Sequence, residues 1–96
     1  MEKIDRKFCI LAVNPANGHI YTEQDSLLLC AKDVAVVPAL KAYRDECERI
    51  GANEAHILSV NLLIERVAKY QNEVNRKIPD TIGAIEIGRC LRGEGV

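Results

Sequence analysis

The fold is decided by residues 34–77, which read VAVVPALKAYRDECERIGANEAHILSVNLLIERVAKYQNEVNRK. In each half of this stretch, apolar residues recur at steps of three and four, which places them on one side of a helix. The first set is Val36, Leu40, Tyr43, Cys47 and Ile50, and the second is Leu63, Val67, Tyr70 and Val74. Two amphipathic helices joined at Gly51 are therefore expected to fold back on each other as an antiparallel hairpin.

Turn and cap residues set the limits of the first helix. Proline is tolerated only in the first turn of a helix, so Pro38 indicates that the helix begins close to it. Asp33 is the expected cap if the helix begins early, and Val37 takes the cap position if Pro38 is the first helical residue. The helix is expected to run to Ile50, because Gly51 suits the left-handed conformation that ends many helices.

The second helix is expected to begin after Asn53, whose side chain can accept a hydrogen bond from the first turn. It is predicted to end at about Arg76, with Arg76 and Lys77 complementing the negative end of the helix. Pro79 cannot continue the helix, and it biases the residue before it toward extended geometry.

The N-terminal third predicts a small antiparallel sheet. Residues 8–13 (FCILAV) are apolar on both faces, as in a covered strand, and residues 14–18 (NPANG) are a strong hairpin signal. Residues 19–22 form the expected return strand, and residues 23–26 a second polar turn. Residues 27–31 are a third apolar run that is too short for a helix. The prediction is an α+β fold, with a three-stranded antiparallel meander followed by the helical hairpin.

We expect one domain over residues 1–96, composed of the meander (1–31), the helical hairpin (34–77) and a short C-terminal segment (78–96). Residues 80–92 fit either a short helix or an edge strand, and the sequence does not choose between them.

Composition restricts the function classes. Hydrophobic residues make up 48% of the chain, a high share for 96 residues, so a homodimer is expected to bury the excess apolar surface. The net charge is −1 with both signs interspersed, which disfavours a nucleic-acid partner. The charged N-terminus and the lack of a long apolar run predict a cytoplasmic protein with no signal peptide and no membrane span.

The four cysteines are far apart in the sequence and form no C-x-x-C motif. We expect free thiols and no bound metal or cofactor. Phosphate-binding and hydrolase motifs are also missing from the sequence, so the protein is predicted not to be an enzyme.

The richest polar cluster lies between residues 14 and 25. It consists of Asn14, Asn17, His19, Tyr21, Glu23 and Asp25. Carboxylates close to a histidine and a tyrosine could perform acid–base chemistry. The same residues could contact a partner, or they could simply form a hairpin tip and the solvent face of a strand, and these readings stay open.

The helices carry mixed charges that read as solvated faces, with Asp45 and Arg49 as an expected ion pair. Arg44, Arg49 and Arg66 could hold a phosphate group if the protein binds a nucleotide signal. His56 reads as an exposed helical residue, because no second metal ligand follows at the required spacing.

One stretch, from residue 27 to residue 71, resembles a known group of proteins. The features are LLLCAKD, the helix-opening Pro38, the spacing of Leu40, Tyr43 and Cys47, Gly51-Ala52, the run from Leu62 to Val67 with Arg66, and Tyr70-Gln71. They resemble small uncharacterised proteins of bacteriophages and prophages. The resemblance implies an accessory protein made in a bacterial cytoplasm, and such proteins commonly bind other proteins and can inhibit host defence systems.

The leading hypothesis is therefore a non-enzymatic phage accessory protein that binds a host or phage protein. One alternative is an oligomeric small-ligand protein that captures a nucleotide signal. Another is a small enzyme or metal protein that uses His19 or His56.

Overall fold

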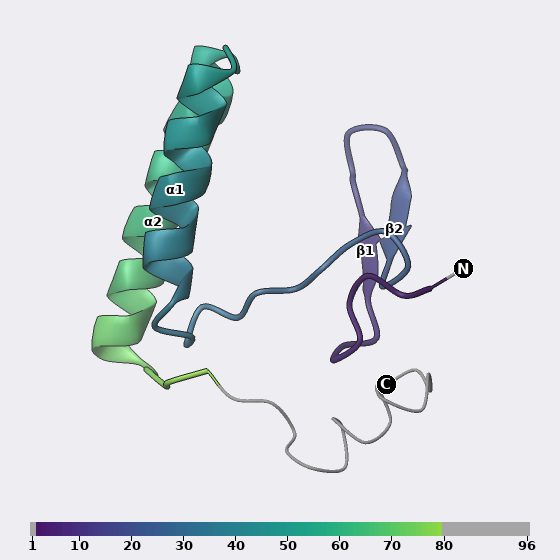
Figure 1. Ribbon diagram of the computed structural model, residues 1–96, viewed down its shortest axis with the longest axis horizontal. Coiled ribbons are helices and arrows are strands. Elements are labelled where there is room, and N and C mark those ends of the chain that lie inside the picture. The colour runs from purple at the N-terminus through teal and green to yellow at the C-terminus, as the bar shows by residue number, and fades with distance from the viewer. Residues whose placement is uncertain (1, 80–96) are drawn as a thin grey trace. The chain divides into compact units, whose positions relative to one another are not determined.

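The computed structural model describes residues 2–79, which divide into two compact units, residues 2–28 and Leu29–Pro79. The first unit contains strands β1 (Leu11–Val13) and β2 (Ile20–Thr22), and the second contains helices α1 (Val36–Arg49) and α2 (Glu54–Glu73) (Figure 1). An antiparallel sheet and a helical hairpin are both present, which confirms the α+β class. The predicted segments within residues 80–92, and Cys90, lie outside the described residues.

Strands β1 and β2 form an antiparallel hairpin in which Leu11 pairs with Thr22 and Val13 pairs with Ile20. The hairpin was predicted, but each strand has only three residues. The third strand of the meander was predicted wrongly, because residues 27–31 are loop and turn. The backbone N–H of Leu28 donates to a side chain instead of a neighbouring strand.

The acceptor of that hydrogen bond is Asp5, the one charged residue that is buried among residues 2–79, with 7% of its surface exposed. Its Oδ2 accepts from the Leu28 N–H at 2.8 Å, and its Oδ1 accepts from the N–H groups of Lys7 and Phe8, each at 2.8 Å. The Asp5 N–H in turn donates to the Glu23 carbonyl oxygen at 3.0 Å. A buried carboxylate thus links the beginning and the end of the first unit.

Helix α1 begins at Val36, and its N-cap is Ala35, which has no capping side chain. Neither predicted cap, Asp33 or Val37, occupies that position. The Asp33 carboxylate instead accepts a hydrogen bond from the Ala35 N–H at 2.8 Å, just before the helix. Pro38 lies in the first turn, as predicted, where its missing N–H is not needed.

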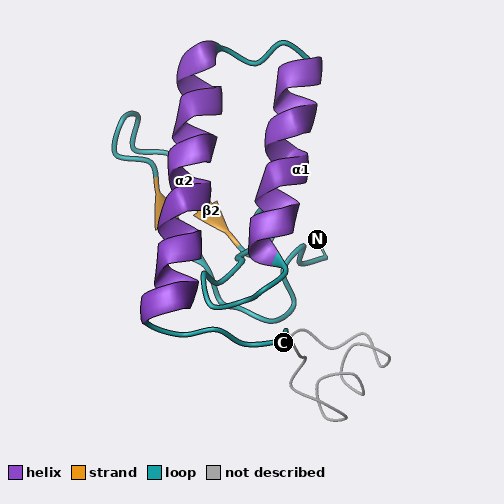
Figure 2. Ribbon diagram, turned by 90° about the vertical axis from the view of Figure 1, so that its left-hand side faces the viewer, coloured by secondary structure: helices purple, strands orange, loops and turns teal. Residues whose placement is uncertain are grey.

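The turn between the helices follows the predicted capping chemistry. Gly51 adopts φ +81°, and the Ala52 N–H donates to the Cys47 carbonyl oxygen at 2.9 Å, which is the pattern of a Schellman motif. Asn53 then caps α2, because its side chain accepts from the His56 N–H at 2.8 Å. A reversal this short sets the two helices side by side and antiparallel (Figure 2).

Helix α2 ends earlier than predicted, at Glu73 instead of Arg76. The N–H groups of Val74 and Asn75 still donate to the Tyr70 carbonyl oxygen, and Lys77 then forms a parallel bridge with Asp33. The Lys77 N–H donates to the Lys32 carbonyl oxygen at 2.8 Å, and the Val34 N–H donates to the Lys77 carbonyl oxygen at 3.1 Å. This pairing requires extended backbone at Lys77. Arg76 and Lys77 therefore lie beyond the helix and do not complement its negative end as predicted.

The core of the helical unit is small and aliphatic. Its buried residues are Val36, Cys47, Val60, Ile64 and Val67. Of the predicted stripe of α1, Val36 and Cys47 are buried, Leu40 is half-buried, and Tyr43 and Ile50 are exposed. On α2 the inner face was predicted wrongly except at Val67, and it is centred on Ile64 instead of Leu63.

Candidate functional site

The two asparagines of the predicted polar cluster shape the hairpin turn. The Asn14 Oδ1 accepts from the Ala16 N–H, and the Asn17 Oδ1 accepts from the His19 N–H, both at 2.9 Å. Gly18, at φ +73°, donates its N–H to the Asn14 carbonyl oxygen at 2.7 Å. These side chains satisfy backbone groups in the turn, which is the structural one of their three readings.

His19 and Tyr21 lie on one face of the return segment, as their spacing predicted. Their ring centroids are 4.6 Å apart and the rings are tilted by 45°. Both side chains are exposed, so together they form an aromatic contact on the surface of the hairpin. No acid or base within hydrogen-bond distance of either ring is found in the described part of the chain.

The two carboxylates of the cluster also bond to nearby groups. Glu23 accepts from the Ile10 N–H at 3.2 Å and from the Cys9 thiol at 3.6 Å. Hydrogen bonds from its own backbone N–H and from that of Ile10 hold the pKa of Glu23 below its usual range. Asp25 accepts from the Thr22 N–H and the Ser26 hydroxyl. Both carboxylates stabilise turns, and the lowered pKa of Glu23 favours its ionised form, which does not suit a general acid.

Several large apolar side chains of the hairpin are exposed. Leu11 is 77% exposed, and more than half of the surface of Val13 and Ile20 is exposed. The strand register puts these three side chains on one face, because Val13 lies opposite Ile20 and two residues from Leu11. A two-stranded sheet also has unpaired backbone groups along both edges. Within residues 2–79 the hairpin therefore presents an apolar face and open edges, which sequence reasoning missed because it read residues 8–13 as a covered strand.

Two of the three arginines proposed for phosphate binding are engaged within the helical hairpin. Arg44 donates to the Asp45 carboxylate at 3.0 Å and to the Asn61 Oδ1 at 3.1 Å. Arg49 forms an ion pair with Glu46, and not with Asp45 as predicted. That pairing lowers the pKa of Glu46 and raises the pKa of Arg49.

The third arginine, Arg66, is exposed on α2 and forms no hydrogen bond or ion pair with any other residue of the range 2–79. Within residues 2–79, the three arginines thus share no common partner.

A contact between the helices joins Tyr43 of the predicted apolar stripe to His56, which was predicted to be an exposed helical residue. The Tyr43 hydroxyl and the His56 Nε2 share a hydrogen bond of 3.1 Å, and their rings meet edge to face at 5.9 Å. A hydrogen bond with Cys47, one turn further along α1, raises the pKa of Tyr43. The short turn at Gly51 could have predicted this pairing, since it brings the end of α1 to the beginning of α2.

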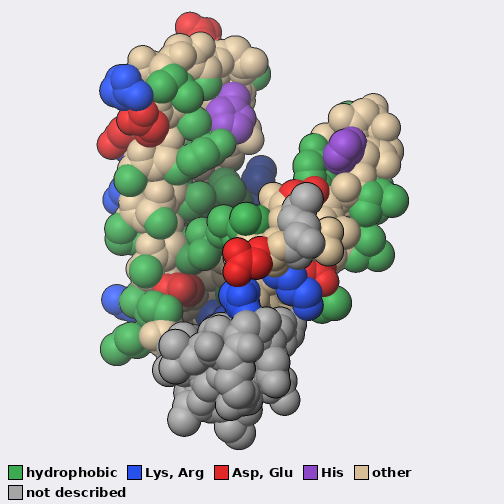
Figure 3. All heavy atoms as spheres, turned by 45° about the vertical axis from the view of Figure 1, so that its right-hand side comes forward, with side chains coloured by type: hydrophobic (Ala, Val, Ile, Leu, Met, Phe, Trp, Pro, Cys, Tyr) green, Lys and Arg blue, Asp and Glu red, His purple; other side chains and the backbone are tan. Residues whose placement is uncertain are grey.

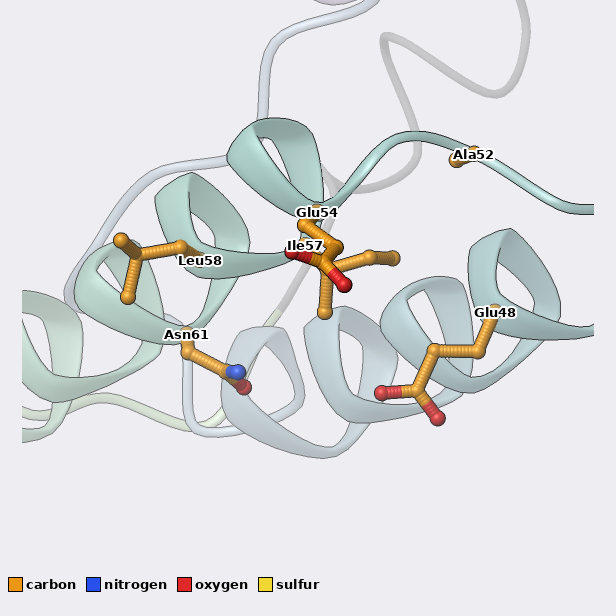
Figure 4. A pocket seen from close by; sticks show the side chains of 6 residues that line it. All are labelled: Glu48, Ala52, Glu54, Ile57, Leu58 and Asn61. Carbon is orange, nitrogen blue, oxygen red and sulfur yellow. The ribbon is translucent and has the colours of Figure 1, made fainter.

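A shallow pocket of about 370 Å³ lies beside the same turn. Figure 4 shows its lining, with Glu48 from α1, Ala52 from the turn, and Glu54, Ile57, Leu58 and Asn61 from α2. Two carboxylates at a pocket repel an anionic ligand, so the pocket does not suit a nucleotide phosphate.

Within residues 2–79, no group of three or more histidine, cysteine, aspartate or glutamate side chains could hold a metal ion. Cys9, Cys30 and Cys47 are free thiols, of which only Cys47 is buried.

Neither helix of the described chain is both long and apolar enough to cross a bilayer. Comparisons with models of protein families, with curated proteins and with solved structures found no match to this chain.

Proposed function

We propose that this protein is a non-enzymatic binding protein that contacts another protein through its β-hairpin, residues 11–22. The observation that carries the proposal is the exposed apolar face formed by Leu11, Val13 and Ile20. A two-stranded hairpin is marginally stable alone, and a further strand or an apolar surface from a partner would complete it. The nearby side chains of Asn14, Asn17 and Asp25 are hydrogen-bonded within their own turns.

The resemblance of residues 27–71 to phage and prophage proteins supplies the context of the proposal. The partner is then a host or phage protein in the bacterial cytoplasm, and a protein of a host defence system is the first kind to test. The protein acts as a homodimer, because one copy leaves many large apolar side chains exposed.

The proposal is tested by capturing partners on the immobilised full chain from lysates of phage-infected bacteria. A captured protein is identified by mass spectrometry and its affinity is then measured by titration. The Val13→Lys and Ile20→Lys variants should bind that partner at least tenfold more weakly, because lysine places a charge on the apolar face.

Ala12→Lys is the matched control, since Ala12 lies on the same strand but points to the opposite face. It should retain the parent affinity. Equal binding by the parent and Val13→Lys would refute the assignment of this face.

A further inference from the structure

The helical hairpin has two broad faces, and a contact between the helices marks each of them. The hydrogen bond between Tyr43 and His56 marks the first, which we call the tyrosine face. The hydrogen bond from Arg44 to Asn61 marks the other, the arginine face. Between the two contacts, the buried residues of the core fill the seam of the helices.

The tyrosine face is apolar along both helices. Seven residues are close to two turns, so Ile50 lies on the side of Tyr43, and Leu63 and Tyr70 lie on the side of His56. Val74, one turn beyond Tyr70, continues the same side. The large apolar side chains are all exposed, from 38% at Tyr70 to 68% at Val74. Figure 3 shows hydrophobic side chains gathered along one face of the helices, with charged side chains toward its edge.

The arginine face is polar in comparison. Steps of three and four from Arg44 and Asn61 reach the exposed polar residues Lys41, Glu48 and Glu65. Leu58 is the one large apolar side chain that is exposed among the residues reached in this way. This face can remain in water, whereas the tyrosine face leaves apolar surface uncovered. The chemistry of the hairpin is thus one-sided, and any apolar cover belongs on the tyrosine face.

We infer that the tyrosine face is covered by the tyrosine face of a second copy, so that two helical hairpins form a four-helix bundle. This deepens the proposed function by naming the surface of the proposed homodimer. The spacing of Tyr43 and Ile50, and of His56, Leu63 and Tyr70, is seven residues, the repeat with which helices pack in such bundles. A second copy supplies two helices with this same repeat, and a twofold axis makes each face its own complement.

Size and charge agree with this occupant. A helix of 20 residues is about 30 Å long, and two adjacent helices span roughly 20 Å, so the face covers on the order of 600 Å². That is close to the roughly 800 Å² that each partner of a stable interface buries. Residues 36–73 carry five basic and six acidic side chains, so two copies do not repel each other strongly.

The test is the mass of the full chain, measured by light scattering after size exclusion at tens of micromolar. The parent should have twice the single-chain mass of 10.7 kDa. Leu63→Glu and Tyr70→Glu should each return the mass to that of one chain while far-UV circular dichroism remains helical. Two variants are used so that a folding failure of one leaves the other informative.

Leu58→Glu is the matched control, because Leu58 is an exposed leucine of α2 that lines the pocket on the other face. It should keep the dimer mass. A monomeric parent would overturn the inference and would mean that residues 1–28 or another part of the same chain cover the face. Dissociation by Leu58→Glu as well would overturn the assignment to the tyrosine face.

The β-hairpin proposal is distinguished by Val13→Lys. This variant should keep the dimer mass and lose the partner, whereas Tyr70→Glu should lose the dimer whatever its effect on the partner.

Discussion

Asp5 is the most enclosed residue of the first unit among residues 2–28, and its hydrogen bonds hold separate segments of that unit together. The first unit has no buried hydrophobic residue among residues 2–28, and its most enclosed group is this carboxylate. Three backbone N–H groups donate to it, and they are drawn from positions before and after the hairpin. A carboxylate with three such donors is held strongly in its ionised form.

Asp5 therefore predicts an acid-sensitive first unit. Burial raises the pKa of Asp5, but hydrogen bonds from Leu28, Phe8 and Lys7 outweigh it and bring the pKa below the ordinary value of 3.8. The unfolded chain then binds the proton more readily than the folded chain. Stability from this group should be complete above pH 3.8 and should be lost as the pH falls through the folded pKa.

Amide hydrogen exchange at Leu28, measured as a function of pH against model-peptide rates, checks this prediction. Asp5→Asn should lower the protection of Leu28 at neutral pH and remove the acid-dependent part. Parent-like protection in Asp5→Asn would show that the carboxylate does not hold the unit together.

Gln71 is a residue whose role the sequence did not reveal. Its Nε2 donates to the carbonyl oxygens of Ala31 at 2.9 Å and Asp33 at 2.8 Å, so it fixes the segment before α1 against α2. The sequence placed Gln71 among the polar residues of a solvated helix face. Periodicity could not correct this, because the two acceptors are backbone atoms about 40 positions away and have no sequence signature.

At the scale of elements, the turn between the helices depends on the backbone of Gly51. At φ +81° a Cβ would meet no atom within 4 Å, so a side chain there is opposed only by backbone strain. Gly51→Ala should lower the free energy of unfolding by about 1–2 kcal/mol. Gly51→Asn should lower it less, since asparagine adopts this conformation more readily. Urea unfolding followed by circular dichroism gives both values, and equal stability of all three chains would contradict the role of the turn.

Ile64 tests the packing register of α2. It is buried, so Ile64→Ala should cost roughly 2–5 kcal/mol in the same urea experiment. Leu58→Ala removes a side chain of similar size from an exposed position and should change stability by about 0.5 kcal/mol or less. If Leu58→Ala were the more harmful substitution, the inner face of α2 would be assigned wrongly.

The elements that sequence could predict are those with local causes. Asn53, Gly51 and Pro38 act on their own neighbours, so the turn, the cap and the first turn of α1 followed from their chemistry. The register of α2 did not follow, because Leu62, Leu63 and Ile64 are all apolar and only packing against α1 chooses between them. The early end of α2 was also hidden, since it depends on pairing between the distant Lys77 and Asp33.

For the whole molecule, cysteine reactivity should report on the two units separately. Cys9 is exposed and Cys47 is buried, so a thiol reagent should label Cys9 quickly and Cys47 slowly in the native chain. Ile64→Ala should accelerate labelling of Cys47 and leave Cys9 unchanged, because only the helical unit is destabilised. Denatured, non-reduced protein should give four thiols per chain, and a count of two would mean that a disulfide is present.

The sequence predicted the location of the candidate site better than the kind of side chains that form it. Sequence reasoning placed the contact surface either at residues 14–25, because of their polar side chains, or on the charged helix faces. The structure uses Asn14 and Asn17 to build the turn. The exposed face of Leu11, Val13 and Ile20 was missed, because an apolar run in a sequence normally signals burial. Exposure depends on what surrounds a strand, and no local pattern encodes that.

The bridge between Asp33 and Lys77 gives the helical unit a property useful to protein engineers. The backbone that enters the unit at Asp33 is hydrogen-bonded to the backbone that leaves it at Lys77. If the unit were excised at these two residues, its ends would lie about 5 Å apart, the spacing of neighbouring strands. A segment whose two ends lie close together can be inserted into a surface loop of an unrelated protein without distorting that loop. Residues 33–77 therefore form an insert that could display the paired-helix surface on another carrier protein.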